Sequence, residues 1–334
     1  MRNVPIFFSF DRNMVIPAGV CITSLLQNAH ADTFYDIFIL CSESTLPEAD
    51  RSKVGRLSEI YDSRCRITFV ETGNAFQGAY EVRDITESTY NRLLIPRLLP
   101  ELNARYSTNY TTVIYLDVDI IVECDLSELP ERCAAQPDKW IFGVCESPLL
   151  TNPSADVSYF ESIGAEPSGY INAGVLVMNA QAMNAVGFTD KCLAHKDRKY
   201  EFQDQDIINI VARGHIGQLP LKYNFTSGLY TVTLENPAFA ERFSEEIKDA
   251  RHGVIHYTGT KPWKGMCIRF EQWWYYFRCS IYRDDSYYKA YYDSLPKLLF
   301  KDEEIRKKLF KLVKKWLKYK LMPWQKKYAR FWNS

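Results

Sequence analysis

Thr112-Val113-Ile114-Tyr115-Leu116-Asp117-Val118-Asp119 joins a strand-like apolar run to a pair of carboxylates. The β-branched and aromatic residues predict a buried strand over 112–116. Unpaired charges are unfavourable at the end of such a strand, because they lose water without gaining a partner. A divalent cation would stabilise Asp117 and Asp119 there, since Mg²⁺ and Mn²⁺ take oxygen ligands and bridge carboxylates to substrate phosphates.

The Asp-x-Asp pattern is weak by itself. The chain has 20 Asp in 334 residues, so about one such pattern is expected by chance. Asp204-Gln205-Asp206 is a second copy. For the first copy, the structural alternative is a solvated turn after the strand, and the pair alone does not decide between the two.

The first 120 residues alternate between strand and helix patterns. This alternation predicts a mostly parallel sheet with helices on both faces, which binds ligands beyond the carboxyl ends of its strands. Asp11 and the Asp117/Asp119 pair follow strands at such ends. Neither Gly-x-Gly nor Gly-Lys-Ser/Thr occurs, which excludes the two common phosphate-binding loops. The expected strands are 4–10, 36–41, 66–71 and 112–116, and the expected helices are 16–28, 47–61 and 88–99.

Beyond residue 140 the pattern is less regular. Small residues within 170–179 predict an elbow that leads into a strand, and 253–257 predicts a short strand. The spacing of apolar residues predicts a helix over 201–213, and the aromatic residues of 269–292 predict packed helices.

Composition is typical of a soluble globular protein, with 46% apolar and 25% charged residues. The length allows one large domain or two moderate ones. Nine scattered Cys without a Cys-x-x-Cys pair predict reduced thiols in a cytoplasmic protein. No apolar run is long enough to span a bilayer, and residues 4–10 are interpreted as a strand and not as a signal peptide.

The neutral net charge hides a basic C-terminal segment. Residues 296–334 contain 13 Lys and Arg against 3 Asp and Glu, so the rest of the chain is acidic. This composition predicts a helix that lies on an anionic membrane surface; the alternative is a helix docked on the protein with a solvated lysine face. Nucleic-acid binding is not expected, because the body is acidic and carries no recognised module. The apolar residues at helical spacing are Ile305, Leu309, Leu312, Val313 and Trp316.

Six short motifs occur in a fixed order along the chain, and this ordered set is more specific for a protein family than any single motif. Together they resemble family 8 of the retaining nucleotide-sugar glycosyltransferases, which contains bacterial lipopolysaccharide galactosyl- and glucosyltransferases and glycogenin. The resemblance covers roughly residues 2 to 280. The motifs are Phe8-Ser9-Phe10-Asp11-Arg12-Asn13, Ser88-Thr89-Tyr90-Asn91-Arg92-Leu93, Tyr115-Leu116-Asp117-Val118-Asp119, Tyr170-Ile171-Asn172-Ala173-Gly174-Val175, Phe202-Gln203-Asp204-Gln205-Asp206 and His256-Tyr257-Thr258-Gly259-Thr260-Lys261-Pro262-Trp263.

The resemblance implies a glycosyltransferase A-type α/β fold. This is a single Rossmann-like nucleotide-sugar-binding domain with a mixed, mostly parallel sheet, followed by a helical basic C-terminal extension. The catalytic domain is expected over 1–280, with a nucleotide-binding half (1–125) and a sugar and acceptor half (126–280). The membrane-associating extension is expected over 281–334.

The resemblance also implies the metal site, in which His256 joins Asp117 and Asp119. Two carboxylates and an imidazole suit Mn²⁺ better than Ca²⁺, with Mg²⁺ as the alternative cofactor. For a lone histidine the alternative is a hydrogen-bonded core residue. Gly259 would let the backbone approach a phosphate, and Lys261 would place a point charge on the departing diphosphate. A solvated surface lysine is the alternative for Lys261.

On the nucleotide side, Asp11 and Asn13 resemble the pair that contacts uracil, although both types also serve as helix N-caps. Met14 stands where the family often has an aromatic ring, so Tyr90, another ring or the Met14 thioether would contact the base. Arg92 matches an arginine near the donor phosphates and sugar, where a guanidinium fork fits, and its alternative is an exposed ion pair. Val118 and Ala173 are expected among the same contacts.

On the sugar side, Asn172 and Asp204 would bind hexose hydroxyls. Gln205 matches the residue on the face opposite the leaving group, and an amide is a poor nucleophile. We therefore expect front-face attack, with Gln205, Asp204 and Arg92 as the catalytic residues and the Gln205 carbonyl stabilising positive charge on the sugar. Glu146 or Ser147 would take an acidic position that the family often has; the sequence does not choose between them.

The predicted activity is metal-dependent transfer of galactose or glucose, with retention, from a UDP-sugar to a glycan. A lipopolysaccharide or other cell-surface glycan at the cytoplasmic face of the membrane is the expected acceptor. The alternatives are a nucleotide-sugar-binding protein without transfer, and a nucleotide-sugar hydrolase or pyrophosphorylase. A pyrophosphorylase would usually carry a glycine-rich and basic N-terminal loop, which residues 9–14 lack.

Overall fold

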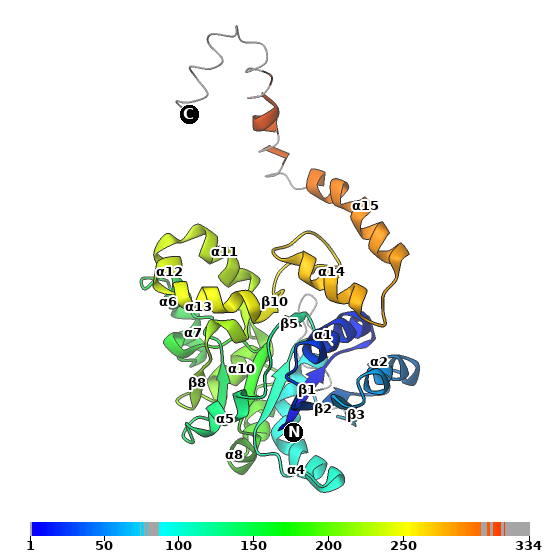
Figure 1. Ribbon diagram of the computed structural model, residues 1–334. Helices are drawn as coiled ribbons and strands as arrows, with labels where there is room; N and C mark the ends of the chain where they lie inside the picture. The colour runs from blue at the N-terminus through cyan, green and yellow to red at the C-terminus, as the bar shows by residue number, and fades with distance from the viewer. Residues whose placement is uncertain are drawn as a thin grey trace. The chain divides into compact units, whose positions relative to one another are not determined.

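The computed structural model describes residues 2–73, 75–76, 78, 87–301, 306–307, 310–314 and 317 (Figure 1). The chain divides into two compact units. The first comprises Met1–Gly259 and Ile268–Arg283, and the second comprises Thr260–Cys267 and Asp284–Ser334. The predicted division into 1–280 and 281–334 stays a prediction.

A seven-stranded sheet forms the centre of the first unit, in the order β3-β2-β1-β4-β7-β6-β8. β7 is antiparallel to β4 and β6, and the other pairs are parallel. The prediction of a mixed, mostly parallel sheet is therefore confirmed. The strands are β1 (Arg2–Ser9), β2 (Thr33–Cys41), β3 (Cys65–Glu71), β4 (Val113–Leu116), β6 (Ile141–Gly143), β7 (Val175–Met178) and β8 (Ile216–Gln218).

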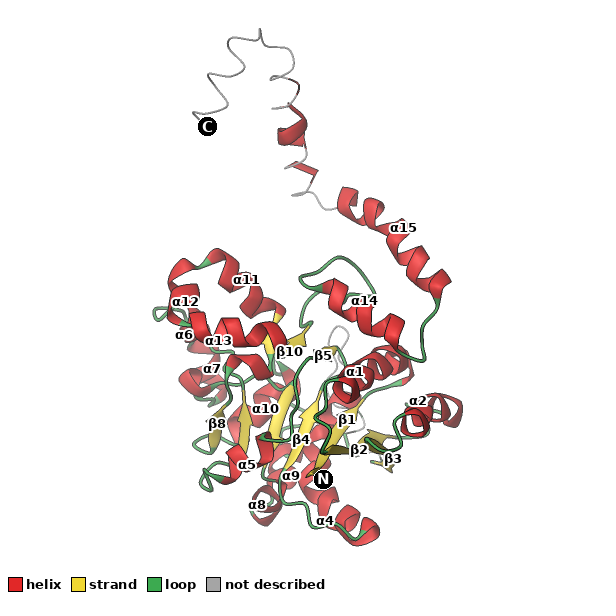
Figure 2. Cartoon of the chain, viewed as in Figure 1, coloured by secondary structure: helices red, strands yellow, loops and turns green. Residues whose placement is uncertain are grey.

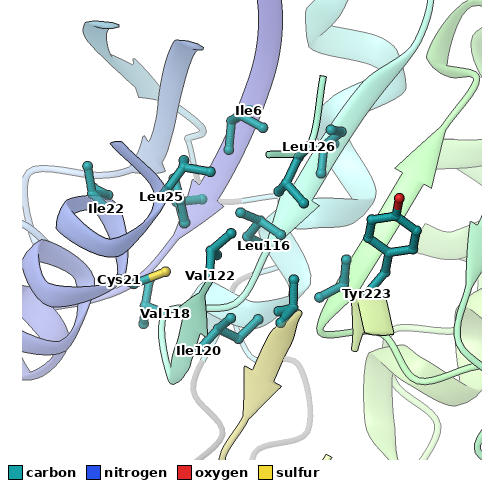
Figure 3. Packing of buried hydrophobic residues seen from close by; sticks show 14 of the residues in the cluster. Ile6, Cys21, Ile22, Leu25, Leu116, Val118, Ile120, Val122, Leu126 and Tyr223 are labelled. Atoms are coloured by element: carbon teal, nitrogen blue, oxygen red, sulfur yellow. The ribbon is translucent and has the colours of Figure 1, made fainter. Parts of the chain in front are cut away.

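Apolar side chains on both faces of this sheet form the core, as a sheet covered by helices requires. Alternate residues of β1 face opposite ways: Ile6 and Phe8 pack in one cluster with α1 (Val15–Gln27), and Phe7 packs in another with α4 (Ile95–Tyr106). Figure 3 shows the first cluster, where Ile6 and Leu116 from neighbouring strands lie beside α1.

The N-terminal helices lie where the sequence predicts them, at α1 and α2 (Glu48–Ile60). A helix occupies 88–99 as predicted, but it is not one regular α-helix: α3 (Glu87–Tyr90) continues into the 3-10 helix η2 (Asn91–Leu94) and then into α4. Pro96, in the first turn of α4, has no N–H to donate to the carbonyl of Arg92, and the N–H of Ile95 forms the tighter 3-10 hydrogen bond to that carbonyl.

A second, three-stranded sheet brings distant parts of the chain together. It pairs β10 (Val254–His256) with β5 (Ile120–Val122) in antiparallel fashion and with β9 (Phe225–Thr226) in parallel. Because β5 follows β4 directly, this sheet places the end of β10 beside the β4–β5 turn (Figure 2).

Short helices complete the first unit. The helix expected over 201–213 is α10 (Gln203–Val211), and the aromatic segment 269–292 contains the helix α14 (Phe270–Cys279), as predicted. The remaining elements are η1 (Arg12–Met14), α5 (Leu129–Ala134), α6 (Pro148–Thr151), α7 (Ser158–Ile163), η3 (Pro167–Gly169), α8 (Ala180–Ala185), α9 (Phe188–Leu193), α10 (Gln203–Val211), η4 (Leu221–Tyr223), α11 (Ser227–Glu235), α12 (Pro237–Arg242), α13 (Ser244–Asp249), η5 (Ala250–His252) and α14 (Phe270–Cys279).

The second unit contains α15 (Asp285–Lys301). Most of the predicted basic helix and all of the aromatic segment after it lie outside the described residues. Within the described part, Phe310, Leu312, Val313 and Leu317 are helical and exposed. No helix in the described ranges is both long and apolar enough to cross a bilayer.

Candidate functional site

Asp117, Asp119 and His256 form a cluster where β4 and β10 end. The turn is held by the backbone: the N–H of Asp117 donates to the carbonyl of Gly174 (2.8 Å), and the N–H of Tyr257 donates to that of Asp119 (3.0 Å). Nε2 of His256 lies 3.4 Å from Oδ1 of Asp119 and 3.9 Å from Oδ2 of Asp117. One ligand atom from each of the three residues lies within 4.8 Å of the others.

This arrangement fits a divalent cation. The side chains of Asp117 and Asp119 are only 24% and 14% exposed, so the pair is not a solvated turn. Two neighbouring carboxylates repel each other, and a cation between them attracts both and offsets that repulsion. Two oxygen donors and one imidazole nitrogen suit a first-row ion such as Mn²⁺.

Arg92 connects this cluster to the sugar-side residues. Its guanidinium is buried, lies 3.0 Å from Oδ1 of Asp117 and 2.9 Å from Oδ2 of Asp204, and stacks over the ring of Tyr115. Burial opposes its charge, but the two carboxylates outweigh burial and raise the pKa of Arg92. The alternative of an exposed surface ion pair is therefore wrong.

Asp204 lies in the first turn of α10 and is 4% exposed. Burial raises the pKa of Asp204 to about 6, although the nearby Arg92 charge acts in the opposite direction. This carboxyl is thus easier to protonate than an ordinary aspartate, and its charge depends on Arg92 staying in place.

Asn172, Gln205 and Glu146 form a network of two amides and one carboxylate, and Arg92 donates to the carbonyl of Ala173 in the same segment. Nδ2 of Asn172 donates to Oε2 of Glu146 (2.8 Å) and Oε1 of Gln205 (3.2 Å). Oε1 of Gln205 also accepts from the N–H of Ala173 (3.0 Å), and its Nε2 donates to Glu146 (3.2 Å). Ser147 instead caps α6, where its hydroxyl accepts from Leu149 N. Of these two residues, Glu146 is the one that hydrogen-bonds to Asn172 and Gln205; that it takes the family's acidic position stays a prediction.

Two residues of this region were missed by the sequence analysis. Asp206, fully buried, accepts hydrogen bonds from the hydroxyls of Tyr159 and Tyr170 and from Phe202 N. Asn224, also fully buried, contacts both Asn172 and His256. Asp206 could have been predicted from the sequence, because it lies beside Gln205 in a predicted helix. Asn224 could not, because it belongs to none of the motifs.

The nucleotide-side residues lie at the carboxyl end of β1, where the topology predicts a ligand. Asp11 accepts from the N–H of Asn13 and caps η1, so the capping role is present, and both side chains are at least partly exposed. Tyr90 is buried and packs on Phe76, so stacking on a base would require this contact to open. Met14 packs against the core beside α1.

The remaining predicted contacts differ in their surroundings. Val118 and Ala173 are buried beside Asp117 and Gly174 in the chain. Gly259 is exposed, and a Cβ built on it would meet nothing within 4 Å. Lys261 belongs to the second compact unit, and its contact with a diphosphate stays a prediction.

Residues 5–267 match the sequence profile of glycosyl transferase family 8. The chain belongs to this family. It is 25% identical over 305 residues to lipopolysaccharide 1,2-glucosyltransferase of Escherichia coli K12, covering 90% of this chain and 79% of that protein. It is also 25% identical over 268 residues to lipopolysaccharide 1,3-galactosyltransferase of Salmonella typhimurium, covering 77% and 72%.

Solved structures of glycosyltransferases share the fold. The galactosyltransferase LgtC, solved with donor and acceptor sugar analogues, matches with a TM-score of 0.67 at 22% identity, over 86% of this chain and 99% of that one. The bifunctional glycosyltransferase WbbM matches with a TM-score of 0.69 at 23% identity, over 87% of this chain and 52% of that one. The family 8 chain described here therefore has the glycosyltransferase A-type fold that its sequence predicted.

Proposed function

We propose that this family 8 chain is a metal-dependent retaining hexosyltransferase that uses a UDP-sugar. The observation that carries the proposal is the convergence of ligand atoms of Asp117, Asp119 and His256 to within 4.8 Å of one another, near a partly buried network of amide and carboxylate groups that could bind sugar hydroxyls. A cation site next to amides and carboxylates is suited to a ligand with a diphosphate at one end and hydroxyls at the other.

The donor sugar is proposed to be glucose or galactose, and the acceptor a lipopolysaccharide or other cell-surface glycan. The support is the similarity to relatives that are named as lipopolysaccharide glucosyl- and galactosyltransferases. Uridine recognition by Asp11 and Asn13 is supported by their position at the carboxyl end of a parallel strand.

Asp117, Asp119 and His256 would hold Mn²⁺, or Mg²⁺ as the alternative. When bound, the ion would act as a Lewis acid that stabilises the charge of the departing diphosphate. Lys261 and the backbone at Gly259 are proposed to contact the same phosphates. Arg92 keeps Asp117 and Asp204 at fixed positions on either side of itself, which orients metal and sugar ligands together.

Asn172 and Asp204 are proposed to bind sugar hydroxyls. Retention without a carboxylate nucleophile at Gln205 favours front-face attack, in which the acceptor hydroxyl gives its proton to the leaving phosphate. Ala173 N–H and Asn172 preorganise the Gln205 amide, and its carbonyl dipole and the Glu146 carboxylate would stabilise positive charge on the sugar.

The C-terminal extension, residues 281–334, is proposed to bind the anionic cytoplasmic face of the membrane through residues 296–334. Its excess of Lys and Arg and its exposed Phe310, Leu312 and Val313 support this role. A peripheral position would bring the catalytic unit close to a lipid-linked acceptor.

A panel of UDP-sugars tests the activity. The purified protein is incubated with Mn²⁺ and each sugar, and UDP release is followed with and without bacterial core oligosaccharides, whose mass is then measured. Acceptor-dependent UDP release and a product heavier by one hexose are expected. Equal UDP release without acceptor would instead identify a hydrolase, and binding without release would identify a nucleotide-sugar-binding protein.

A further inference from the structure

Asn224 lies between the candidate metal ligand His256 and the sugar-side residue Asn172. It follows η4 and precedes β9, whose Thr226 pairs with His256 of β10. The three side chains are almost completely enclosed, with exposed fractions of 0% for Asn224, 4% for His256 and 6% for Asn172. Water therefore does not compete for their hydrogen bonds.

The direction of these hydrogen bonds follows from one backbone amide. The N–H of Gly174 can only donate, so the Asn172 atom 2.9 Å from it is the oxygen, Oδ1. The Asn224 atom 2.7 Å from that oxygen must then be its nitrogen, Nδ2. The remaining oxygen of Asn224, Oδ1, faces Nδ1 of His256 at 2.8 Å, so Nδ1 carries the proton.

The opposite ring nitrogen is thereby left as an acceptor. With Nδ1 protonated, Nε2 of the neutral ring has a free lone pair, and Nε2 is the atom that faces Asp119 and Asp117. A carboxylate at position 224 would also accept from Nδ1, but it would turn a second acceptor toward Oδ1 of Asn172. Only an amide supplies an acceptor on one side and a donor on the other.

We propose that Asn224 is a positioning residue that fixes the metal-binding tautomer of His256 and couples it to the orientation of Asn172. The inference rests on the proposed function, because it assigns Asn224 a role toward the metal and sugar of that site. Residues that orient a metal-bound histidine typically change metal affinity by about 10- to 100-fold when they are removed.

The tautomer is tested first without any substitution. The ring ¹⁵N signals of the metal-free protein are recorded by NMR at a pH where imidazoles are neutral, and the His256 signals are identified by their loss in His256→Gln. A protonated Nδ1 and an unprotonated Nε2 are expected. A ring protonated on Nε2 would overturn the proposal.

Metal affinity is then measured by the EPR signal of free Mn²⁺, which needs no substrate. Asn224→Leu should weaken Mn²⁺ binding by about 10- to 100-fold, whereas Asn224→Asp, which keeps the acceptor for Nδ1, should stay within about threefold of wild type. The matched control is Asn209→Leu, a buried asparagine that bonds to Ile171 and Gln205 and not to His256. Its Mn²⁺ affinity should be unchanged.

The coupling to Asn172 predicts a second difference. With Mn²⁺ present, Asn224→Asp should bind UDP like wild type but lose at least about threefold in affinity for the UDP-hexose. Wild-type Mn²⁺ affinity in both Asn224 variants would overturn the inference. If Asn224→Leu folds poorly, the tautomer measurement still tests the inference, because it is made on the unaltered protein. A wild type that binds no Mn²⁺ or transfers no sugar would contradict the proposed function instead.

Discussion

Gly174 packs directly against the ring of His256. A Cβ built on Gly174 would lie 2.2 Å from Cε1 and 2.7 Å from Nδ1 of the imidazole. The Asn172-Ala173-Gly174 segment before β7 and the histidine at the end of β10 are thus packed together, and the glycine leaves the space that the ring occupies.

Gly174→Ala should therefore displace His256. Because the two nearest neighbours of the new methyl group belong to one rigid ring, we expect Mn²⁺ affinity to fall by about tenfold or more, as measured by EPR. Gly169→Ala is the matched control, since its Cβ would meet only Glu166 Cγ at 3.7 Å. Equal Mn²⁺ affinity in both variants would show that the close packing has no bearing on the metal.

Removing the metal should stop the reaction. Treatment with EDTA should abolish UDP release and Mn²⁺ should restore it, because the diphosphate loses its main source of charge stabilisation. Asp119→Asn should lower turnover by about 100-fold or more at saturating Mn²⁺, whereas the exposed Glu59→Gln should have little effect. Full turnover in EDTA would contradict a metal-dependent mechanism.

Arg92→Met should destabilise the protein strongly. The change leaves the carboxylates of Asp117 and Asp204 without the cation between them, and breaking a buried pair of this kind reduces the free energy of unfolding by about 3–5 kcal/mol. Arg92→Lys should recover only part of the lost stability, because the ammonium keeps the positive charge but cannot contact both carboxylates as the guanidinium does. The exposed Arg97, paired with Asp190, is the control, and Arg97→Met should change stability by less than about 1 kcal/mol in urea unfolding.

The raised pKa of Asp204 predicts a specific dependence of stability on pH. Its folded-state pKa of about 6 exceeds the ordinary value, so its contribution to stability is present at low pH and is lost as pH rises through 6. Relative to Asp204→Asn, the metal-free wild type should lose about 2 kcal/mol of unfolding free energy between about pH 4 and pH 8. A difference that is constant or increases with pH would show that burial does not penalise this carboxylate.

Deleting residues 296–334 should separate membrane binding from catalysis. The shortened protein should keep its activity on soluble acceptors but no longer sediment with anionic vesicles, because each Lys or Arg near such a surface contributes about 1 kcal/mol. Binding of the full chain should weaken in high salt and be absent on neutral vesicles. Unchanged partitioning after deletion would reject the membrane role. A second variant that lacks residues 302–334 leaves α15 whole, and so controls for damage to that helix.

The sequence by itself determined the alternating strands and helices of the first 120 residues and the family. Both follow from local information. The β-branched and aromatic residues before Asp117 favour a buried strand, and the order of the motifs that contain Asn172 and His256 is read directly from the sequence. The local pattern also predicted the helix near 88–99 but not its 3-10 segment, which carries Arg92 and precedes Pro96.

Only the tertiary structure decided how these motifs meet. Arg92 lies between two carboxylates, Glu146 and not Ser147 joins Gln205, and Asn224 links two motifs although it belongs to none. The contact between Asn224 and His256 depends on β10 pairing with β9, which is distant along the chain. The pattern of residues in a segment predicts which side chains are buried. It does not predict the hydrogen-bond partner of a buried polar group, because that partner comes from a distant segment that packing brings close.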